Sequence, residues 1–302
     1  MKKLMQWTYF LDVLGYGAEQ KKIDTQEKAD NFMEFMKVNK SFIEFQDGMN
    51  KDFYSDKEIN IYDLYEIKSV FISDSFVLTA IPKDKEFEDD EYYHLSSSIV
   101  MELTFQILYF IENILDEKEL TIRGGISKKF TDIDTESSLA VGQGLIEAYK
   151  LESKDATVPR ILLSQDISDD KKLMSYFEKH SKMYGENFSI FSKDTDNFYY
   201  LNYLGFMLAI LRRSENPNNK RNSFPKEIAE FISKNNIDLN GETKNRTIKT
   251  LENFKKVIQK NLKEQSSNDN PDIYNKYVWL KKYHNSTIED FQDLEFIQKY
   301  KI

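Results

Sequence analysis

The stretch from Trp7 to Gly17 reads WTYFLDVLGYG and combines an apolar strand pattern with one acid and two glycines. Aromatic and branched residues are typical of a strand, and Gly15 follows Leu14 where we expect the strand to end. Asp12 lies inside the apolar run, where a carboxylate must be paired or must bind a cation. A helix cap or a buried salt bridge is the structural alternative for Asp12.

Outward from this stretch, strand and helix patterns alternate up to about residue 213. The expected elements are a helix over 25–49, two strands over 65–81 joined at 73–75, a core helix over 95–115, a strand over 120–127, a helix over 142–152, a strand over 158–163 and a hairpin over 188–201. This order has too few parallel crossovers for a Rossmann sheet. It favours an α+β, ferredoxin-like domain that has a mostly antiparallel sheet with helices on one face.

The composition limits the possible classes of protein. Of the 302 residues, 40% are hydrophobic and 14% aromatic, which is enough for a sizeable core and excludes global disorder. The absence of cysteine excludes disulfides, iron–sulfur clusters, thiolate zinc sites and a cysteine nucleophile. The three histidines are far apart in the sequence, and the net charge of −9 argues against nucleic acid as a partner.

Nothing in the sequence indicates export or stable membrane insertion. The apolar stretch near the start is broken by Asp12 and lacks a small-residue cleavage site. The longest apolar run, Tyr199 to Leu211, contains Asn202 and is too short to cross a bilayer, so we interpret it as a buried helix. We therefore expect a cytoplasmic protein.

The last ninety residues differ in charge and pattern from the rest. The acidic excess lies in residues 1–213, whereas residues 214–302 carry slightly more basic than acidic side chains. The polar stretch SENPNNKR at 214–221 marks the change. We expect an α+β domain over 1–213 and a helical region over 214–302, with amphipathic helices near 226–233, 247–262 and 274–283. A long loop within one domain is the alternative.

Six of the ten glycines form three pairs, each at the end of an expected strand or the start of an expected helix. They are Gly15 and Gly17, Gly124 and Gly125, and Gly142 and Gly144. Glycine lets a backbone approach a ligand closely, although turn geometry alone explains any one pair.

A second acid, Asp74, lies between apolar runs in FISDSFVL. Ser-Asp-Ser is also ordinary turn composition. If the first strand lies beside this hairpin, Asp12 and Asp74 meet at the sheet edge, and two hard oxygen ligands suit Mg²⁺ or Mn²⁺. Backbone N–H groups after Asp12 can cradle a triphosphate, and a metal pair would let an acidic domain hold an anionic nucleotide.

Five segments, FLDVLGYG, FISDSFVL, IRGGIS, GQGLIEAYKLES and VPRILLS, resemble the class III nucleotide cyclase catalytic domain in order and spacing. The resemblance spans roughly Tyr9 to Leu204 and is closest to the bacterial branch that includes the pyrimidine cyclases of Pycsar anti-phage defence. The tail segment YVWLKKYHN at 277–285 also resembles the ends of proteins in that branch. The family implies a ferredoxin-like cyclase palm, a homodimer with composite sites, and two divalent ions, Mn²⁺ or Mg²⁺, that bridge the triphosphate.

The resemblance also implies roles for individual residues. Asp12 and Asp74 match the two metal-binding aspartates, and Val13 matches the position whose backbone carbonyl also touches a metal. Arg123 resembles the arginine that begins the family's RGGI strand, where it would contact nucleotide or phosphate; a structural ion pair is its alternative. The phosphate loop is matched by Val13, Leu14, Gly15, Tyr16 and Gly17.

The chain departs from the adenylate and guanylate cyclases of that family at several positions. The purine-reading position is Val70, which cannot hydrogen-bond, and Lys68 on the same strand face is a poor substitute. Ile146 replaces the transition-state asparagine, and Lys150 replaces the arginine, supplying charge without a bidentate fork. Gln143 occupies a second base-reading position. We therefore expect a pyrimidine substrate or reduced activity.

The resemblance implies a lyase that converts a pyrimidine nucleoside triphosphate, UTP first and CTP second, to the 3′,5′-cyclic monophosphate and pyrophosphate. Such a product would be a second messenger in anti-phage defence, read by an effector protein that the sequence does not identify. The alternative is a degenerate cyclase-like domain that serves as a nucleotide sensor or dimerisation module, which Val70 and Ile146 favour. A scaffold whose basic tail binds a partner protein or nucleic acid ranks last.

Overall fold

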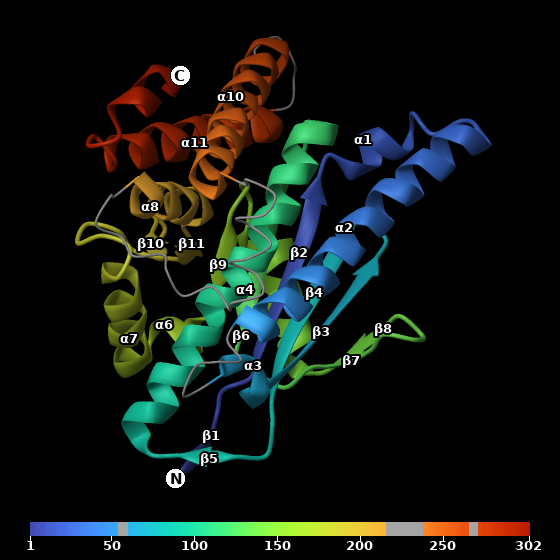
Figure 1. The fold of residues 1–302 in the computed structure, drawn as a ribbon. Helices are drawn as coiled ribbons and strands as arrows, with labels where there is room; N and C mark the ends of the chain where they lie inside the picture. The colour runs from blue at the N-terminus through green and yellow to red at the C-terminus, as the bar shows by residue number, and fades with distance from the viewer. Residues whose placement is uncertain (54–59, 216–237, 266–270) are drawn as a thin grey trace.

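The computed structural model describes residues 1–53, 60–215, 238–265 and 271–302 (Figure 1). Its centre is a seven-stranded sheet in which all neighbouring strands are antiparallel except β6 and β9. In spatial order the strands are β10 (Phe191–Lys193), β11 (Tyr199–Leu201), β9 (Ile161–Leu163), β6 (Thr121–Ser127), β2 (Trp7–Leu14), β4 (Ser75–Pro82) and β3 (Tyr65–Ile72). The predicted α+β class with a mostly antiparallel sheet is confirmed.

Helices and two small two-stranded sheets complete the fold. The helices are α1 (Tyr16–Gln20), α2 (Gln26–Phe53), α3 (Ile61–Leu64), α4 (Asp89–Lys118), α5 (Gln143–Lys150), α6 (Gln165–Ser168), α7 (Lys171–Lys182), α8 (Tyr203–Glu215), α10 (Leu239–Gln265) and α11 (Pro271–Glu289), with a π-helical turn η1 (Leu151–Asp155) and a 3₁₀ helix η2 (Glu295–Tyr300). One small sheet pairs β1 (Lys2–Lys3) with β5 (Glu86–Phe87), which are far apart in the sequence, and the other is a hairpin of β7 (Asp132–Asp134) and β8 (Leu139–Val141). The apolar run at 199–211 forms β11 and most of the buried helix α8.

Strand β2 organises the centre of the sheet because it pairs with β4 over Trp7–Asp12 and with β6 over Thr8–Leu14. The register sets Asp12 opposite Ser75 on β4 and opposite Arg123 on β6. Residues distant in the sequence therefore meet at the end of β2.

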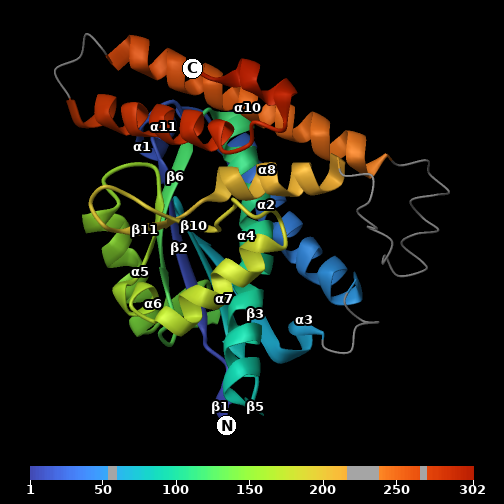
Figure 2. The same ribbon diagram turned by 90° about the vertical axis from the view of Figure 1, so that its left-hand side faces the viewer.

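Side chains of β2 point alternately to two covered faces of the sheet. Leu11 and Val13 are buried in the main core, which α4 helps to form. Phe10 packs on the other face against Val77 of β4 and Ala148 of α5. Figure 2 shows α5 and α4 on opposite sides of β2. The prediction of helices on one face is wrong, because the short helix α5 covers the second face.

Helix α4 is the one described helix that is long and apolar enough to cross a membrane by length and composition. Within its most apolar window, 72% is buried inside the fold, as in a core helix of a soluble protein. Buried apolar side chains lie all round this helix, because it packs between the sheet and the surrounding helices.

The C-terminal helices pack on the rest of the chain. The expected amphipathic stretches at 247–262 and 274–283 lie within α10 and α11, whereas the stretch at 226–233 lies outside the described residues. Phe254 of α10 and Leu280 of α11 belong to the same hydrophobic core as Leu208 of α8. Side chains on both sides of the expected boundary near residue 213 therefore share one core.

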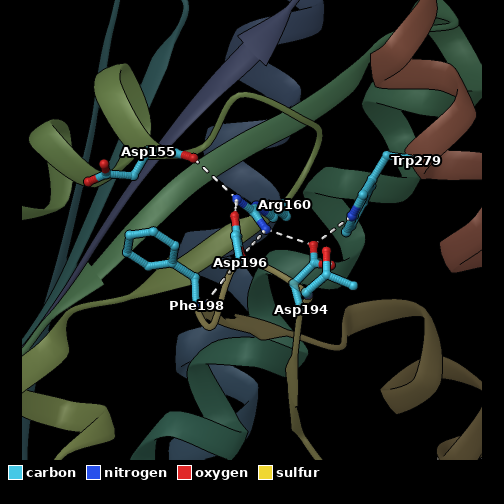
Figure 3. A network of polar contacts seen from close by, with 7 residues as sticks. Asp155, Arg160, Asp194, Asp196, Phe198 and Trp279 are labelled. Atoms are coloured by element: carbon cyan, nitrogen blue, oxygen red, sulfur yellow. Dashed lines mark hydrogen bonds and ion pairs between the residues drawn. The ribbon is translucent and has the colours of Figure 1, made fainter.

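A buried arginine also joins α11 to the sheet (Figure 3). Arg160, immediately before β9, donates through Nη1 to Asp194 at 2.6 Å and to Asp196 at 3.1 Å. Trp279 of α11 donates from Nε1 to the same Asp194 carboxylate at 2.7 Å. The backbone oxygen of Arg160 accepts from Gly124 of β6 at 3.0 Å, so the network links α11 to the central strands.

Candidate functional site

Asp12 and Asp74 belong to backbone segments that are hydrogen-bonded to each other. The amide of Val13 donates to the carbonyl oxygen of Asp74 at 3.2 Å, because the β3–β4 turn lies beside the end of β2. Ser73 in this turn has a φ of 60°. The structure thus brings the two predicted metal-binding segments together. They meet at the end of interior strand β2, beside the turn that joins edge strand β3 to interior strand β4.

Arg123 contacts Asp12 from the neighbouring strand β6. Its Nε donates to Oδ2 of Asp12 at 3.2 Å, and the Asp12 side chain is 17% exposed. The ion pair that the sequence left as an alternative for both residues is therefore present. Burial raises the pKa of Asp12, Arg123 opposes this effect, and the nearby Asp74 carboxylate adds to it. Burial is therefore the main reason that the pKa of Asp12 is raised.

Glu152 is a third acid in this site, and the sequence analysis did not single it out. Its Oε1 lies 2.6 Å from Nε of Arg123, and its side chain is only 4% exposed. Burial raises the pKa of Glu152 to about 7, against the effect of Arg123 and with a further contribution from Asp12. The segment YKLES contains this glutamate, but a local pattern cannot show that it turns toward Arg123.

The donor set around Asp12 suits a hard cation that keeps other ligands. No group of three or more His, Cys, Asp or Glu side chains in the described part of the chain is arranged to hold a metal ion. Mg²⁺ is usually bound by one or two carboxylates, with water and substrate phosphates completing the coordination. Asp12 and Asp74 would supply two such carboxylates, because their backbone segments are hydrogen-bonded to each other. Burial is the main cause of the raised pKa of Asp12, and a bound cation would oppose it by favouring the ionised carboxylate.

The predicted phosphate loop begins where β2 ends. Gly15 has a φ of 92°, and a Cβ atom there would lie 2.8 Å from Cδ2 of Leu120, so only glycine fits without strain. Tyr16 is half-buried beside Ser73 and Asp74, and burial raises its pKa. A Cβ atom at Gly17 would meet no atom within 4 Å. The loop therefore lies against the Asp74 turn and has open space at Gly17.

The other predicted site residues, Gln143 and Lys150, belong to α5. Gln143 and Lys150 are on the exposed side of α5, and within the described residues no hydrogen bond or ion pair joins either of them to Arg123. Val70 is buried against Phe10 and Val77, so its side chain is part of the core.

Lys68, the weak candidate for base reading, is engaged elsewhere. Its Nζ lies 3.0 Å from Asp132 of the β7–β8 hairpin and 3.8 Å from Glu66. These contacts tie β3 to the hairpin and give Lys68 a structural role.

Exposed apolar side chains gather on α5 and the neighbouring hairpin. We call them the α5 patch: Phe130, Leu139, Val141, Ile146 and Tyr149. The amide of Gly144 in α5 donates to the carbonyl of Phe130 at 2.8 Å, so these segments are adjacent. Single exposed apolar residues are ordinary, but an exposed apolar cluster marks an interaction surface.

The chain matches no protein-family model, and the search among curated proteins also finds no match.

Proposed function

We propose that this protein is a class III-like nucleotide cyclase that converts a pyrimidine nucleoside triphosphate, UTP first and CTP second, to its 3′,5′-cyclic monophosphate. The observation that carries the proposal is the meeting of the Asp12 and Asp74 segments beside the glycine-containing loop over 13–17. A cytoplasmic role in anti-phage defence, with an effector protein that reads the product, belongs to the same proposal.

The topology of the central strands supports a ferredoxin-like palm. In chain order β2, β3, β4 and β6 are the first to fourth strands, with α2 after the first and α4 after the third. Their spatial order is fourth, first, third, second, and every pair is antiparallel. This β-α-β-β-α-β order is the one expected of a ferredoxin-like motif, which supports the proposal.

In the proposed reaction the ribose 3′ hydroxyl gives its proton to water and its oxygen forms a bond to the α-phosphorus. The bond between that phosphorus and the bridging oxygen breaks, and pyrophosphate leaves with the electron pair. Asp12 and Asp74, with the Val13 carbonyl, would hold two divalent ions, Mn²⁺ or Mg²⁺. When bound, such ions supply charge neutralisation and lower the pKa of a coordinated hydroxyl. The loop over 13–17 binds the polyphosphate, and Arg123 stabilises charge on the reacting phosphate.

A homodimer completes the proposed site. Lys150 and Gln143 lie on the exposed side of α5, next to the α5 patch. Burying that patch against a second copy would remove apolar surface from water. It would also carry α5 of one subunit toward the aspartates of the other, where Lys150 adds positive charge and Gln143 contacts the base.

The test is incubation of the purified protein with each of the four ribonucleoside triphosphates and Mn²⁺, followed by mass spectrometry of the products. We expect cyclic UMP, or cyclic CMP, together with pyrophosphate. Absence of every cyclic product from a folded, dimeric protein would reject the enzyme proposal.

A nucleotide sensor is the second candidate. Two observations favour it: Val70 is buried in the core, and the exposed side chain at position 146 is an isoleucine without hydrogen-bonding groups. A sensor would bind a nucleoside triphosphate in calorimetry and leave it unchanged after prolonged incubation.

A further inference from the structure

Arg123 is held by two acids that come from different parts of the chain. Strand register places Arg123 directly opposite Asp12, so both side chains point to the face of the sheet that α5 covers. Glu152 reaches the same guanidinium from η1, which follows α5 directly. The Nε atom lies 3.2 Å from Asp12 Oδ2 and 2.6 Å from Glu152 Oε1.

This arrangement leaves the outer end of the guanidinium free. Both contacts use Nε, and neither terminal nitrogen of Arg123 hydrogen-bonds to any of the described residues. The side chain is 25% exposed. Terminal nitrogens that project from an anchored Nε form the planar fork that binds phosphate oxygens in a bidentate manner.

Burying the Glu152 carboxylate costs free energy, because few groups compensate its charge. Oε1 accepts no hydrogen bond of good geometry despite its short distance to Arg123 Nε. No basic side chain other than Arg123 forms an ion pair with Glu152 in the described part of the chain. A buried carboxylate that depends on one cation loses free energy when that cation leaves. Glu152 therefore favours the conformation of Arg123 in which the two remain in contact.

A divalent cation bound to Asp12 would compete with Arg123 for that carboxylate. Even on Oδ1, the oxygen that Nε does not contact, the cation would repel the guanidinium at this distance and weaken its contact with Asp12. Glu152 would then be the remaining acidic partner of Arg123.

We propose that Glu152 is a positioning residue that retains the Arg123 guanidinium when Asp12 binds a divalent cation, so that the free terminal nitrogens face the triphosphate. This inference rests on the proposed function. The inference adds Glu152 to the site and assigns each acid a different role. Asp12 binds the cation, and Glu152 binds Arg123, which would otherwise compete with the cation for Asp12.

The experiment is a double-mutant cycle on Mn²⁺ affinity, measured by electron paramagnetic resonance without nucleotide. Its members are the wild type, Glu152→Gln, Arg123→Gln and the double variant. In Glu152→Gln, Arg123 keeps only Asp12 as a partner and competes with the cation, so we expect Mn²⁺ affinity to fall about tenfold. In the Arg123→Gln background, we expect Glu152→Gln to change the affinity by less than about threefold.

The matched control is Glu147→Gln on α5. Glu147 is ion-paired to Lys129 at 2.5 Å and accepts from Ser127, and among the described residues it forms no hydrogen bond or ion pair with Arg123. Its replacement should leave Mn²⁺ affinity at the wild-type value. Circular dichroism and thermal unfolding establish that each variant is folded.

Two results would overturn the role of Glu152. Unchanged Mn²⁺ affinity in Glu152→Gln means that Glu152 does not hold Arg123 away from Asp12. An equal loss in both backgrounds means that Glu152 acts on the metal directly rather than through Arg123.

The cycle separates this inference from the proposed function. Wild-type protein that binds Mn²⁺ but forms no cyclic product would reject the enzyme, while the cycle still decides the role of Glu152. Wild-type protein that binds no Mn²⁺ would overturn both.

Discussion

Two aspartates at the end of β2 and in the β3–β4 turn carry the proposed chemistry. Asp12 is mostly buried beside Arg123, and Asp74 lies in a turn whose backbone accepts from Val13. Asparagine has nearly the shape of aspartate but lacks the charge that holds a divalent cation.

We expect Asp12→Asn and Asp74→Asn each to lower the rate of cyclic product formation at least about a hundredfold, because a bound metal contributes several kcal/mol of charge stabilisation. The measurement is product mass spectrometry at saturating UTP and Mn²⁺. Asp63→Asn, at an exposed position on α3, is the control and should keep wild-type activity. Undiminished turnover in either site variant would reject the metal assignment.

A buried histidine in the C-terminal region makes stability depend on pH. His284 is fully buried, its Nε2 has no hydrogen-bond partner, and burial lowers its pKa to about 4. The unfolded histidine, with a pKa near 6.5, binds a proton that the folded one does not. Unfolding free energy should therefore fall as the pH drops from about 6.5 to about 4. His180, with a pKa also lowered to about 4, contributes in the same direction.

Replacing His284 by Phe should reduce this pH dependence by about 1.4 kcal/mol per pH unit between the two pKa values. Phe is chosen because His284 packs near the Phe254 ring. Urea unfolding of both proteins at several pH values measures the slopes. Identical slopes would show that His284 does not titrate differently in the folded and unfolded states.

At the scale of elements, the position of α5 depends on close packing against β6. A Cβ atom at Gly125 would lie 2.3 Å from the carbonyl oxygen of Ala148 and 2.8 Å from Cβ of Leu151. A Cβ atom cannot lie that close to a carbonyl oxygen. Helices α5 and η1 can therefore pack this near to β6 only because residue 125 is glycine. The same packing brings Glu152 to Arg123.

Gly125→Ala should therefore force α5 outward and destabilise the fold by roughly 1–3 kcal/mol, the usual cost of overpacking. Gly48→Ala is the control, because a Cβ atom there meets nothing within 4 Å and alanine is the better helix former in α2. Denaturant unfolding measures both variants. A loss of stability in Gly48→Ala equal to that in Gly125→Ala would contradict the packing argument.

The attachment of α11 through Trp279 is a second element-scale contact. The indole Nε1 donates to the Asp194 carboxylate that also binds buried Arg160. Trp279→Phe keeps an aromatic ring but loses this donor, so we expect a loss of roughly 1.5–3 kcal/mol of stability, as for hydrogen bonds to charged groups. Tyr274→Phe, at an exposed position of the same helix, should cost nothing measurable. Equal stabilities of the two variants in urea would contradict a role for the Trp279 bond.

At the scale of the whole molecule, the proposed active enzyme is a dimer that buries the α5 patch. Val141 is 62% exposed within it, so a charge there is harmless to the single chain but costly inside an apolar interface. We expect Val141→Lys to be monomeric in sedimentation experiments under conditions where the wild type is dimeric. We also expect the monomeric variant to have no turnover, because the proposed site needs both subunits. Val278→Lys, at an exposed apolar position of α11 outside the patch, should remain dimeric. A dimeric Val141→Lys protein would place the interface elsewhere.

Much of the core could be predicted because its signals are local. The strand over Trp7–Leu14 and the hairpin that turns at Ser73 and Asp74 follow from apolar patterns and turn residues. The β7–β8 hairpin was missed because strands of three residues, DID and LAV, carry too little pattern. Helix α7 was also missed, although its buried residues at 173, 176, 177 and 180 follow helical spacing.

Composition, alternation and turn chemistry were enough to predict the α+β class and to select Asp12 and Asp74, because a lone acid in an apolar strand and an acid in a tight turn stand out locally. The pairing of Arg123 with Glu152, the cover that α5 gives to the second face and the docking of Trp279 depend on strand register and on side chains that meet across 29 to 85 residues of chain. Such contacts follow from the joint packing of all the elements, so no single segment of the sequence encodes them.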